Sequence, residues 1–206
     1  MSTTDTPDKE SLILDPDARL MMQVKQGDEA AFEELMEHYQ NRVLTVLFNA
    51  LGQREEAEDL TQEVFLRVYR ARHGYQPTAK FSTWVFTIAN NLASNARRAH
   101  LFRKTVPIEA RESGPLGPRP AEQLAESTEP TASGELQRGE VAQIVREAVG
   151  KLNERQRMAV LLNKFEDMSY EEIAQVMDLS LTAVKSLLSR ARTNLREILE
   201  PYLDVI

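Results

Sequence analysis

The sequence predicts an all-α protein made of two small helical domains joined by a flexible linker. Apolar residues recur at spacings of three and four over most of the chain, as in helices that bury one face. No stretch alternates apolar and polar residues in the way that a half-buried strand does. Five of the nine prolines lie between residues 105 and 134, together with glycine, serine, threonine and glutamate, a composition typical of linkers.

These observations divide the 206 residues into four parts. We expect an acidic, disordered tail over residues 1–14 and a first helical domain over residues 15–104. The linker covers residues 105–134, and a second helical domain covers residues 135–206. The chain has 42% hydrophobic and 28% charged residues, which is enough apolar material for one or two modest cores.

The composition also excludes several classes of protein. No run of about 18 apolar residues could span a bilayer, and the N-terminus lacks the basic start and apolar stretch of a secretion signal, so we expect a cytoplasmic protein with no direct membrane insertion. With no cysteine and only three scattered histidines, the sequence predicts no disulfide, no metal site and no cofactor.

Two capped helices open the first domain. Asp15 is an N-cap with Pro16 at the first helical position, and Gly27 ends that short helix. Asp28 caps the second helix, whose apolar face continues until Gly52. The sequence therefore marks both ends of each helix.

Two further helices complete the first domain. The third covers about residues 54–72 and has an apolar stripe beside a polar face. The fourth begins near Ser82, which we expect to be its N-cap, and turns Trp84 and Ile88 inward. The four helices predict a small bundle.

The second domain begins with a helix over about residues 135–149 and a helix capped by Asn153. Ser169 and Glu172 then form a capping box, in which the serine accepts from the third amide and the glutamate accepts from the cap amide. This box starts a short helix over residues 170–177.

A tight turn over residues 178–180 separates that short helix from a longer one over residues 181–199. The longer helix has one apolar face and one polar, cationic face, which together with the turn predicts a helix-turn-helix. Such a helix fits the major groove, where Lys and Arg donate to guanine and Ser or Thr contact phosphates or bases. The candidate DNA-binding residues are Thr182, Lys185, Ser186, Ser189, Arg190 and Arg192.

The net charge of −7 is unevenly distributed. Residues 1–37 hold ten Asp and Glu against three Lys and Arg, a balance of −7 that equals the balance of the whole chain. Residues 80–104 and 185–196 contain several Lys and Arg and no acid. Two basic blocks in an acidic protein favour phosphate contacts.

Several segments resemble one known family. Residues 169–174 (SYEEIA) and 183–192 (AVKSLLSRAR) resemble region 4 of the extracytoplasmic-function (ECF) sigma factors of bacterial RNA polymerase. Residues 27–32 (GDEAAF), 57–70 (AEDLTQEVFLRVYR) and 81–91 (FSTWVFTIANN) resemble region 2 in order and spacing. The resemblance covers nearly the whole chain apart from the linker and the first dozen residues.

Three residues depart from the pattern of the family. Thr87 and Leu187 stand where many members have arginine, so one promoter contact is in doubt and the −35 sequence preference cannot be copied from a relative. Asp178 stands where many members have glycine, and we expect only a local backbone adjustment there.

The resemblance implies a non-enzymatic subunit that binds core RNA polymerase and directs it to promoter DNA. It implies that the third helix docks on the β′ clamp helices, that region 4 meets the β flap and reads −35, and that an anti-sigma factor restrains the protein. The implied polymerase-binding residues are Asp59, Gln62, Glu63, Phe65, Leu66 and Arg67. The residues implied to recognise and melt −10, where aromatic rings lie beside cations, are Tyr75, Lys80, Phe81, Asn91, Arg97 and Arg98.

Two other functions stay open at this point. A stand-alone helix-turn-helix regulator would bind duplex DNA tightly without polymerase. A helical interaction module would carry the basic blocks only as solvated surfaces.

Overall fold

The computed structural model describes the backbone of residues 15–105 and 132–202, and the side chains of residues 15–100 and 141–202. The predicted tail and nearly all of the predicted linker lie outside these residues. The described chain is all helical, which confirms the fold class. Its elements are α2 (Pro16–Lys25), α3 (Glu29–Leu51), α4 (Arg54–Ala71), η1 (Arg72–Gly74), α5 (Phe81–Thr105), α6 (Ala132–Lys151), α7 (Glu154–Phe165), α8 (Tyr170–Met177), α9 (Leu181–Leu199) and η2 (Glu200–Tyr202).

The predicted caps of α2 and α3 are confirmed. The Asp15 carboxylate accepts from the amide of Asp17 at 3.2 Å, and the Asp28 carboxylate accepts from the amide of Ala31 at 3.2 Å. Gly52 ends α3 with φ 80°, in the left-handed region that glycine adopts without steric cost.

The predicted start of α5 is wrong by one residue, and Ser82 is not its cap. The helix begins at Phe81, whose backbone N–H donates to Oδ2 of Asp15 at 2.8 Å. One carboxylate therefore satisfies amides at the starts of both α2 and α5. Local capping rules did not predict this contact because the two residues lie 66 positions apart.

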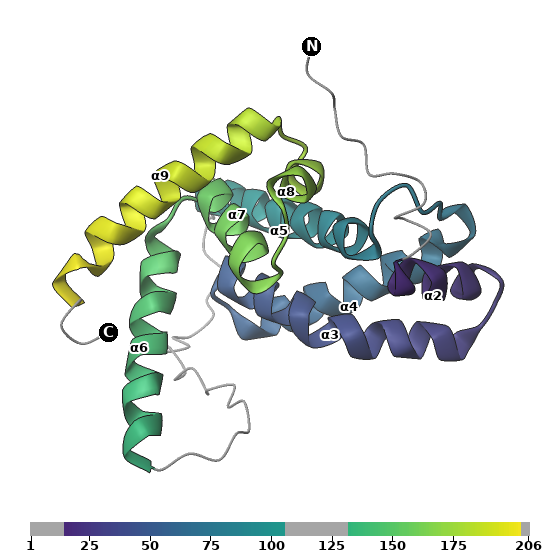
Figure 1. Cartoon of the computed structure of the whole chain (residues 1–206), viewed down its shortest axis with the longest axis horizontal. Coiled ribbons are helices and arrows are strands. Elements are labelled where there is room, and N and C mark those ends of the chain that lie inside the picture. Colours follow the sequence, from purple (N-terminus) through teal and green to yellow (C-terminus); the bar gives the residue numbers. More distant parts are fainter. Residues whose placement is uncertain (1–14, 106–131, 203–206) are drawn as a thin grey trace.

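The first four helices pack as a bundle around one apolar core (Figure 1). At one end of this core Tyr39, Tyr75, Phe81 and Trp84 form an aromatic cluster, with ring centroids 5.0 Å apart for Tyr39 and Phe81 and 4.9 Å apart for Tyr75 and Trp84. The cluster anchors the segment between α4 and α5. The largest fully buried side chains of the bundle include Met21, Leu35, Leu47, Phe81 and Phe86.

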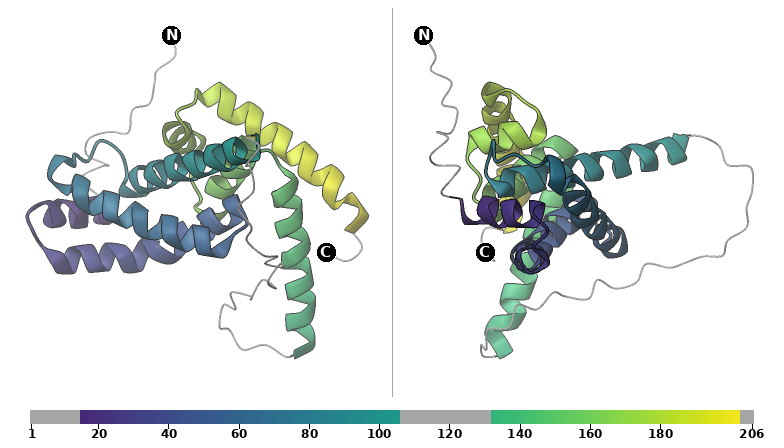
Figure 2. Two further views of the ribbon diagram at one scale, coloured as in Figure 1. Left: turned by 180° about the vertical axis from the view of Figure 1, so that it is seen from behind. Right: turned by 90° about the vertical axis from the view of Figure 1, so that its right-hand side faces the viewer.

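Helices α7, α8 and α9 pack together, and α6 contacts α9 and α3 near one end before it extends away from the rest of the molecule (Figures 1 and 2). Asn153 caps α7 by accepting from the amide of Gln156 at 2.9 Å. The fully buried residues of this part include Leu161, Leu162, Ile173, Val184 and Ala191.

The two helical parts lie against each other. Helix α8 packs on α5, and α7 packs on α3 (Figure 1). Buried side chains from both parts belong to one continuous apolar cluster. A flexible linker, as predicted from the sequence, does not require the domains that it joins to touch, so this contact is a finding of the structure.

Candidate nucleic-acid interface

The helix-turn-helix forms as the sequence predicts. The amide of Glu172 donates to Oγ of Ser169 at 3.2 Å, and the amide of Ser169 donates to Oε2 of Glu172 at 2.7 Å, which confirms the capping box. Asp178 makes the turn with φ 52°, and Ser180 caps α9 by accepting from the amide of Ala183 at 3.2 Å. The left-handed Asp178 occupies the position where the family pattern favours glycine.

Helix α9 turns its cationic face to solvent. Val184, Leu188 and Ala191 are buried on the other face. Among the described residues, none forms a hydrogen bond or ion pair with the side chains of Lys185 and Arg190. This face therefore presents the charged groups of Lys185 and Arg190 to solvent. The exposed set contains all the predicted −35 residues: Thr182, Lys185, Ser186, Ser189, Arg190 and Arg192.

One residue of this face already has a neighbour. The Arg192 guanidinium donates to the Tyr170 hydroxyl at 2.6 Å, so the first residue of α8 orients an arginine of α9. A pre-oriented guanidinium loses less side-chain freedom when it meets a phosphate or base.

Two aromatic residues predicted to contact −10 DNA lie inside the protein. Phe81 is 0% exposed and Tyr75 is 4% exposed, and both belong to the aromatic cluster. Burial raises the pKa of the Tyr75 hydroxyl, with further contributions from Asp15 and Asp17. Within the described part of the chain this hydroxyl has no hydrogen-bond partner. In this conformation neither ring offers a face to an unstacked base.

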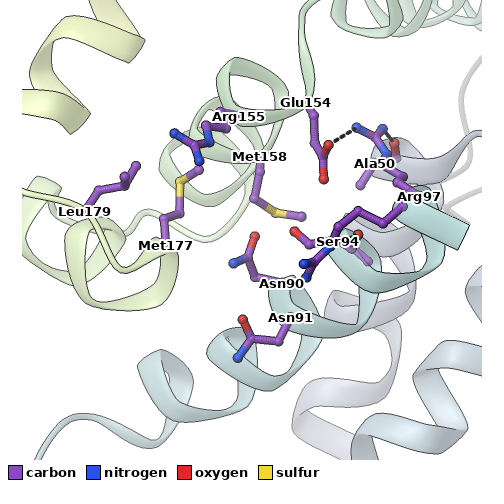
Figure 3. A pocket seen from close by; sticks show the side chains of 12 residues that line it. Ala50, Asn90, Asn91, Ser94, Arg97, Glu154, Arg155, Met158, Met177 and Leu179 are labelled. Carbon is purple, nitrogen blue, oxygen red and sulfur yellow. Dashed lines mark hydrogen bonds and ion pairs between the residues drawn. The ribbon is translucent and has the colours of Figure 1, made fainter. Parts of the chain in front are cut away.

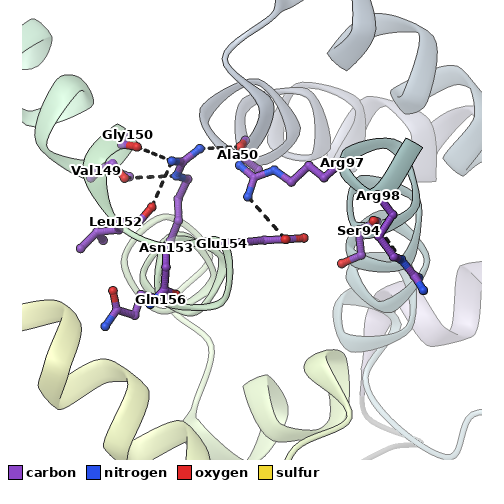
Figure 4. A network of polar contacts seen from close by, with 11 residues as sticks. Ala50, Ser94, Arg97, Arg98, Val149, Gly150, Leu152, Asn153, Glu154 and Gln156 are labelled. Atoms are coloured by element: carbon purple, nitrogen blue, oxygen red, sulfur yellow. Dashed lines mark hydrogen bonds and ion pairs between the residues drawn. The ribbon is translucent and has the colours of Figure 1, made fainter. Parts of the chain in front are cut away.

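The polar −10 candidates lie on or next to α5, and two of them are engaged. Lys80 pairs with Glu172 of α8 at 2.8 Å. Arg97 donates to the carbonyl of Ala50 and lies 4.0 Å from the Glu154 carboxylate (Figure 4).

Two other −10 candidates keep exposed side chains. Arg98 donates within its own helix, to Asn95 at 2.7 Å and to the Ser94 carbonyl at 3.3 Å. Asn91 is exposed and lines a cavity between the two helical parts.

That cavity has a volume of about 380 Å³ (Figure 3). Helix α5 supplies amide, hydroxyl and guanidinium groups to one wall, and α7, the end of α8 and the turn before α9 supply the other wall. The lining therefore mixes cations with methionine and leucine side chains. It includes Asn90, Ser94, Arg97, Arg155, Met158 and Met177.

The predicted polymerase-binding surface on α4 is largely exposed. Leu66 is 49% exposed, although it is apolar, and Arg67 pairs with Glu63 at 2.7 Å on the helix surface. Asp59 and Gln62 also face solvent. Phe65 differs, because it is 5% exposed and packs in the core of the bundle. Leu66 is thus the apolar side chain of this set that a partner could cover.

Sequence reasoning missed the pair Arg42 and Glu166, which joins α3 to the end of α7. Their side chains approach to 2.6 Å, and the Glu166 side chain is 2% exposed. Burial raises the pKa of the Glu166 carboxyl even though Arg42 acts against the rise. The guanidinium also lies over the rings of Tyr39 and Phe86, at 4.5 and 6.0 Å from their centroids.

Arg157 of α7 was also missed. Its guanidinium donates to the carbonyls of Val149 and Leu152 at the end of α6, and to that of Ala50 at the end of α3 at 2.8 Å. Figure 4 shows Arg97 and the Ala50 carbonyl in the same network. No sequence spacing marks the contact of Arg42 with Glu166, 124 positions away, or that of Arg157 with Ala50, 107 positions away.

The described residues contain no group of three or more metal-ligating side chains that could hold an ion. In the same residues, no helix is both long and apolar enough to cross a membrane.

Comparison with known proteins decides the family. The model for Sigma-70 region 2 matches residues 35–101, and the model for Sigma-70 region 4 matches residues 142–195. The RNA polymerase sigma-H factor of Pseudomonas aeruginosa is 32% identical over 193 residues, which are 93% of this chain and 98% of that protein. The chain belongs to the sigma-70 family. The ECF RNA polymerase sigma-E factor of Escherichia coli K12, 31% identical over 91% of this chain and 96% of that protein, places this sigma factor in the ECF group.

Solved structures share the fold of this sigma factor. CnrH in complex with the cytosolic domain of CnrY superposes with a TM-score of 0.64 at 22% identity, covering 90% of this chain and 97% of that one. RpoE of Bartonella quintana in complex with the anti-sigma factor NepR gives a TM-score of 0.59 at 21% identity, covering 82% and 96%.

Proposed function

We propose that this sigma factor binds core RNA polymerase and directs promoter-specific transcription initiation. The observation that carries the proposal is the order of region 2 and region 4 in one chain, with an exposed polar surface on α4 and an exposed cationic face on α9. The protein supplies binding energy and strand opening, while phosphodiester synthesis belongs to the polymerase, so we propose no enzymatic activity for the sigma factor itself. It acts in the cytoplasm.

Helix α9 reads the −35 element in the major groove. The six predicted −35 residues are all exposed, and three of them are cations that can donate to guanine or phosphate oxygens. The buried opposite face fixes the helix on the domain, so the cationic face is presented as a rigid unit.

Region 2 recognises and melts the −10 element along α5 and the segment that precedes it. Lys80, Arg97 and Arg98 provide cations, and Asn91 provides an exposed amide close by. Tyr75 and Phe81 are buried and anchor the segment between α4 and α5 on the core. A base-stacking role requires one of these rings to leave the core. Opening DNA costs roughly 1–2 kcal/mol per stacking step, which base stacking of about 1–3 kcal/mol per base can offset.

The polymerase contacts divide between the two regions. Leu66 and its polar neighbours on α4 dock on the β′ clamp helices, and region 4 docks on the β flap. Interfaces depend on a few well-covered apolar anchors, and Leu66 is suited to that role. An anti-sigma factor is a further partner, as for the related RpoE solved with the anti-sigma factor NepR.

Pull-down with core RNA polymerase tests the proposal. The wild-type protein should be retained, and Leu66→Asp should weaken retention at least tenfold without loss of helicity, since Leu66 is half exposed in the free protein. Val145→Asp is a matched control, because Val145 is also an exposed apolar residue and lies on α6. Failure of the wild-type protein to bind polymerase would rule out the proposed function.

A stand-alone helix-turn-helix regulator is the second candidate, because α9 is exposed while part of the −10 set is engaged. It predicts tight, sequence-specific duplex binding without polymerase. A gel shift with a library of random duplexes, run with and without core polymerase, separates the two functions.

A further inference from the structure

The cavity between the two helical parts gathers positive charge (Figure 3). Its described lining holds three guanidinium groups, those of Arg97, Arg98 and Arg155, and one carboxylate, that of Glu154. Arg97 and Glu154 lie 4.0 Å apart, too far for a hydrogen bond, and the Glu154 side chain is 43% exposed. A single, loosely paired carboxylate therefore leaves the described lining of the cavity with an excess of positive charge.

A fourth guanidinium group lies next to this lining. Arg97 and Arg157 both donate to the Ala50 carbonyl, which brings two like charges to one oxygen atom (Figure 4). Burial lowers the pKa of Arg157, and the charge of Arg97 lowers it further, against the opposing effect of Glu154. Clefts lined by charges of one sign concentrate ions of the opposite sign. The cavity is therefore suited to an anion.

Several donors of the lining have no partner within the part of the chain that the structure describes. No hydrogen bond or ion pair there involves the side chain of Asn91, Ser94 or Arg155. The Arg97 side chain is 18% exposed, so water screens its charge less than it screens a charge at the surface. Phosphate suits such a site, because its oxygens accept from several guanidinium and hydroxyl donors at once.

The rest of the lining is suited to a flat ring. Met158 is buried, and Met177 and Leu179 are partly buried, so the cavity has an apolar side. Thioether groups make favourable contacts with aromatic rings. The side-chain nitrogen of Asn90 donates to the Val176 carbonyl at 3.3 Å, which leaves the side-chain oxygen of Asn90 as an acceptor. Side-chain amides of this kind pair with the edges of nucleobases.

We propose that this cavity is a binding site for a nucleoside polyphosphate, whose phosphates contact the arginines of the lining and whose base packs on the methionines. The volume of about 380 Å³ lies in the range of small-ligand sites, which occur preferentially at domain interfaces. The ligand contacts both helical parts, so it binds only while they lie together and stabilises their contact. The site goes beyond the proposed function and does not depend on it, because binding needs neither polymerase nor promoter DNA.

Isothermal titration calorimetry of the full-length protein with ATP and with GTP tests the site. At about 0.15 M salt, where attraction between exposed charges is largely screened, at least one nucleotide should bind with a dissociation constant below about 1 mM. The matching nucleoside lacks the phosphates and inorganic triphosphate lacks the base, so each should bind about tenfold more weakly or worse. No binding of either nucleotide, or equal binding of the nucleoside or of triphosphate, would overturn the proposal.

Arg155→Glu locates the nucleotide within the molecule. Arg155 lies on α7 and lines the cavity with an exposed side chain, so reversing its charge should weaken nucleotide binding about tenfold or more while the helical circular dichroism is kept. Arg146→Glu makes the same change at an exposed arginine of α6 outside the lining and should leave the affinity unchanged. Equal affinities in Arg155→Glu and the wild type would place the nucleotide elsewhere and overturn the proposal.

Ser94→Phe tests the cavity without a change of charge. The phenyl group occupies the space of the ligand, so nucleotide binding should be lost. Ala99→Phe, at an exposed residue of α5 outside the lining, is its control and should bind as the wild type does. Wild-type affinity in Ser94→Phe would overturn the proposal. These titrations contain neither polymerase nor DNA, so their failure leaves the proposed function intact, and a failed polymerase pull-down leaves the nucleotide site intact.

Discussion

Asp15 and Asp17 show how single carboxylates hold distant elements of this fold together. Asp15 accepts from amides of α2 and α5. Asp17 accepts from the Tyr39 hydroxyl at 2.6 Å and contacts Nδ1 of His38 at 3.1 Å, which ties α2 to α3. Hydrogen bonds to charged groups are stronger than neutral ones. The two residues therefore fix the end of the bundle that carries the aromatic cluster.

The tyrosine hydroxyls of this cluster predict opposite effects on stability. Tyr75→Phe should raise the free energy of unfolding by about 1 kcal/mol, because a buried hydroxyl that lacks a partner within the described chain is removed. Tyr39→Phe should lower it by about 2 kcal/mol, because the hydrogen bond to Asp17 is removed. Urea unfolding of both variants measures the pair. A loss of stability in Tyr75→Phe would show that its hydroxyl is satisfied in solution.

Glu166 predicts a dependence of stability on pH. Burial raises the pKa of its carboxyl, so the folded protein holds this proton more tightly than the unfolded chain does. Its stabilising contribution is present below the ordinary Glu pKa and is lost as pH rises through the raised value. The free energy of unfolding of the wild type, relative to that of Glu166→Gln, should therefore fall as pH rises from the ordinary Glu pKa through the raised pKa of Glu166. A pH-independent difference between the two proteins would contradict this assignment.

At the scale of the element, α8 and α9 are defined by caps and by one turn. Ser169 and Ser180 cap the two helices, and Asp178 makes the turn in the left-handed region. Aspartate tolerates this conformation better than most residues, although glycine adopts it more easily. The structure therefore explains why a departure from the family pattern at this position leaves the helix-turn-helix intact.

The turn predicts the effect of substitutions at Asp178. The free energy of unfolding of Asp178→Gly should be about 1 kcal/mol higher than that of Asp178→Ala. The reason is that the Cβ of alanine is sterically disfavoured at the left-handed φ of this position, whereas glycine has no Cβ. Thermal and urea unfolding of the two variants provide the comparison. If alanine were equally stable, the turn would not hold φ near 52° in solution.

The cationic face of α9 predicts how the affinity for duplex DNA depends on salt. Replacing Lys185, Arg190 and Arg192 by alanine should weaken binding to duplex DNA and flatten the plot of log affinity against log salt, by about 0.9 for each phosphate that the variant no longer neutralises. Arg146→Ala, at an exposed arginine of α6, should leave the slope unchanged. An equal slope in the triple variant and the wild type would show that these side chains do not touch DNA.

At the scale of the whole molecule, the net charge and the local charge of the two basic blocks have opposite signs. The excess of acid over base lies in residues 1–37, and the two basic blocks lie in regions 2 and 4. The contact between the two helical parts pairs Lys80 and Arg97 of one basic block with Glu172 and Glu154. An acidic average charge therefore describes the free protein, while the DNA-reading faces are locally cationic.

The acidic tail predicts a long-range effect on DNA affinity. Residues 1–14 contain three acids and one base, so deleting them makes the protein less negative. The deleted protein should bind duplex DNA severalfold more tightly at low salt, and the gain should shrink at high salt because screening removes it. Fluorescence anisotropy at two salt concentrations measures this difference. If the deletion gave no gain in affinity, the tail would not weaken the binding of DNA.

The sequence by itself determined the all-α class, the helix boundaries that it specified to within three residues, the capping box and the cationic face of α9. These features follow from side-chain spacing and from caps that act within one or two helical turns, so they depend only on residues that are close together in the sequence. The resemblance then located regions 2 and 4, and the comparisons confirmed the family.

Only the tertiary structure decided how the parts meet. Asp15 reaches Phe81 across 66 positions and Arg42 reaches Glu166 across 124, and no local rule specifies such pairs. Tyr75 and Phe81, the aromatic members of the predicted −10 set, were expected to form a surface for bases. Their packing against Trp84 and Tyr39 places them in the core instead. Burial depends on which distant faces come together, because an apolar ring has the same sequence signature whether a helix or a base covers it.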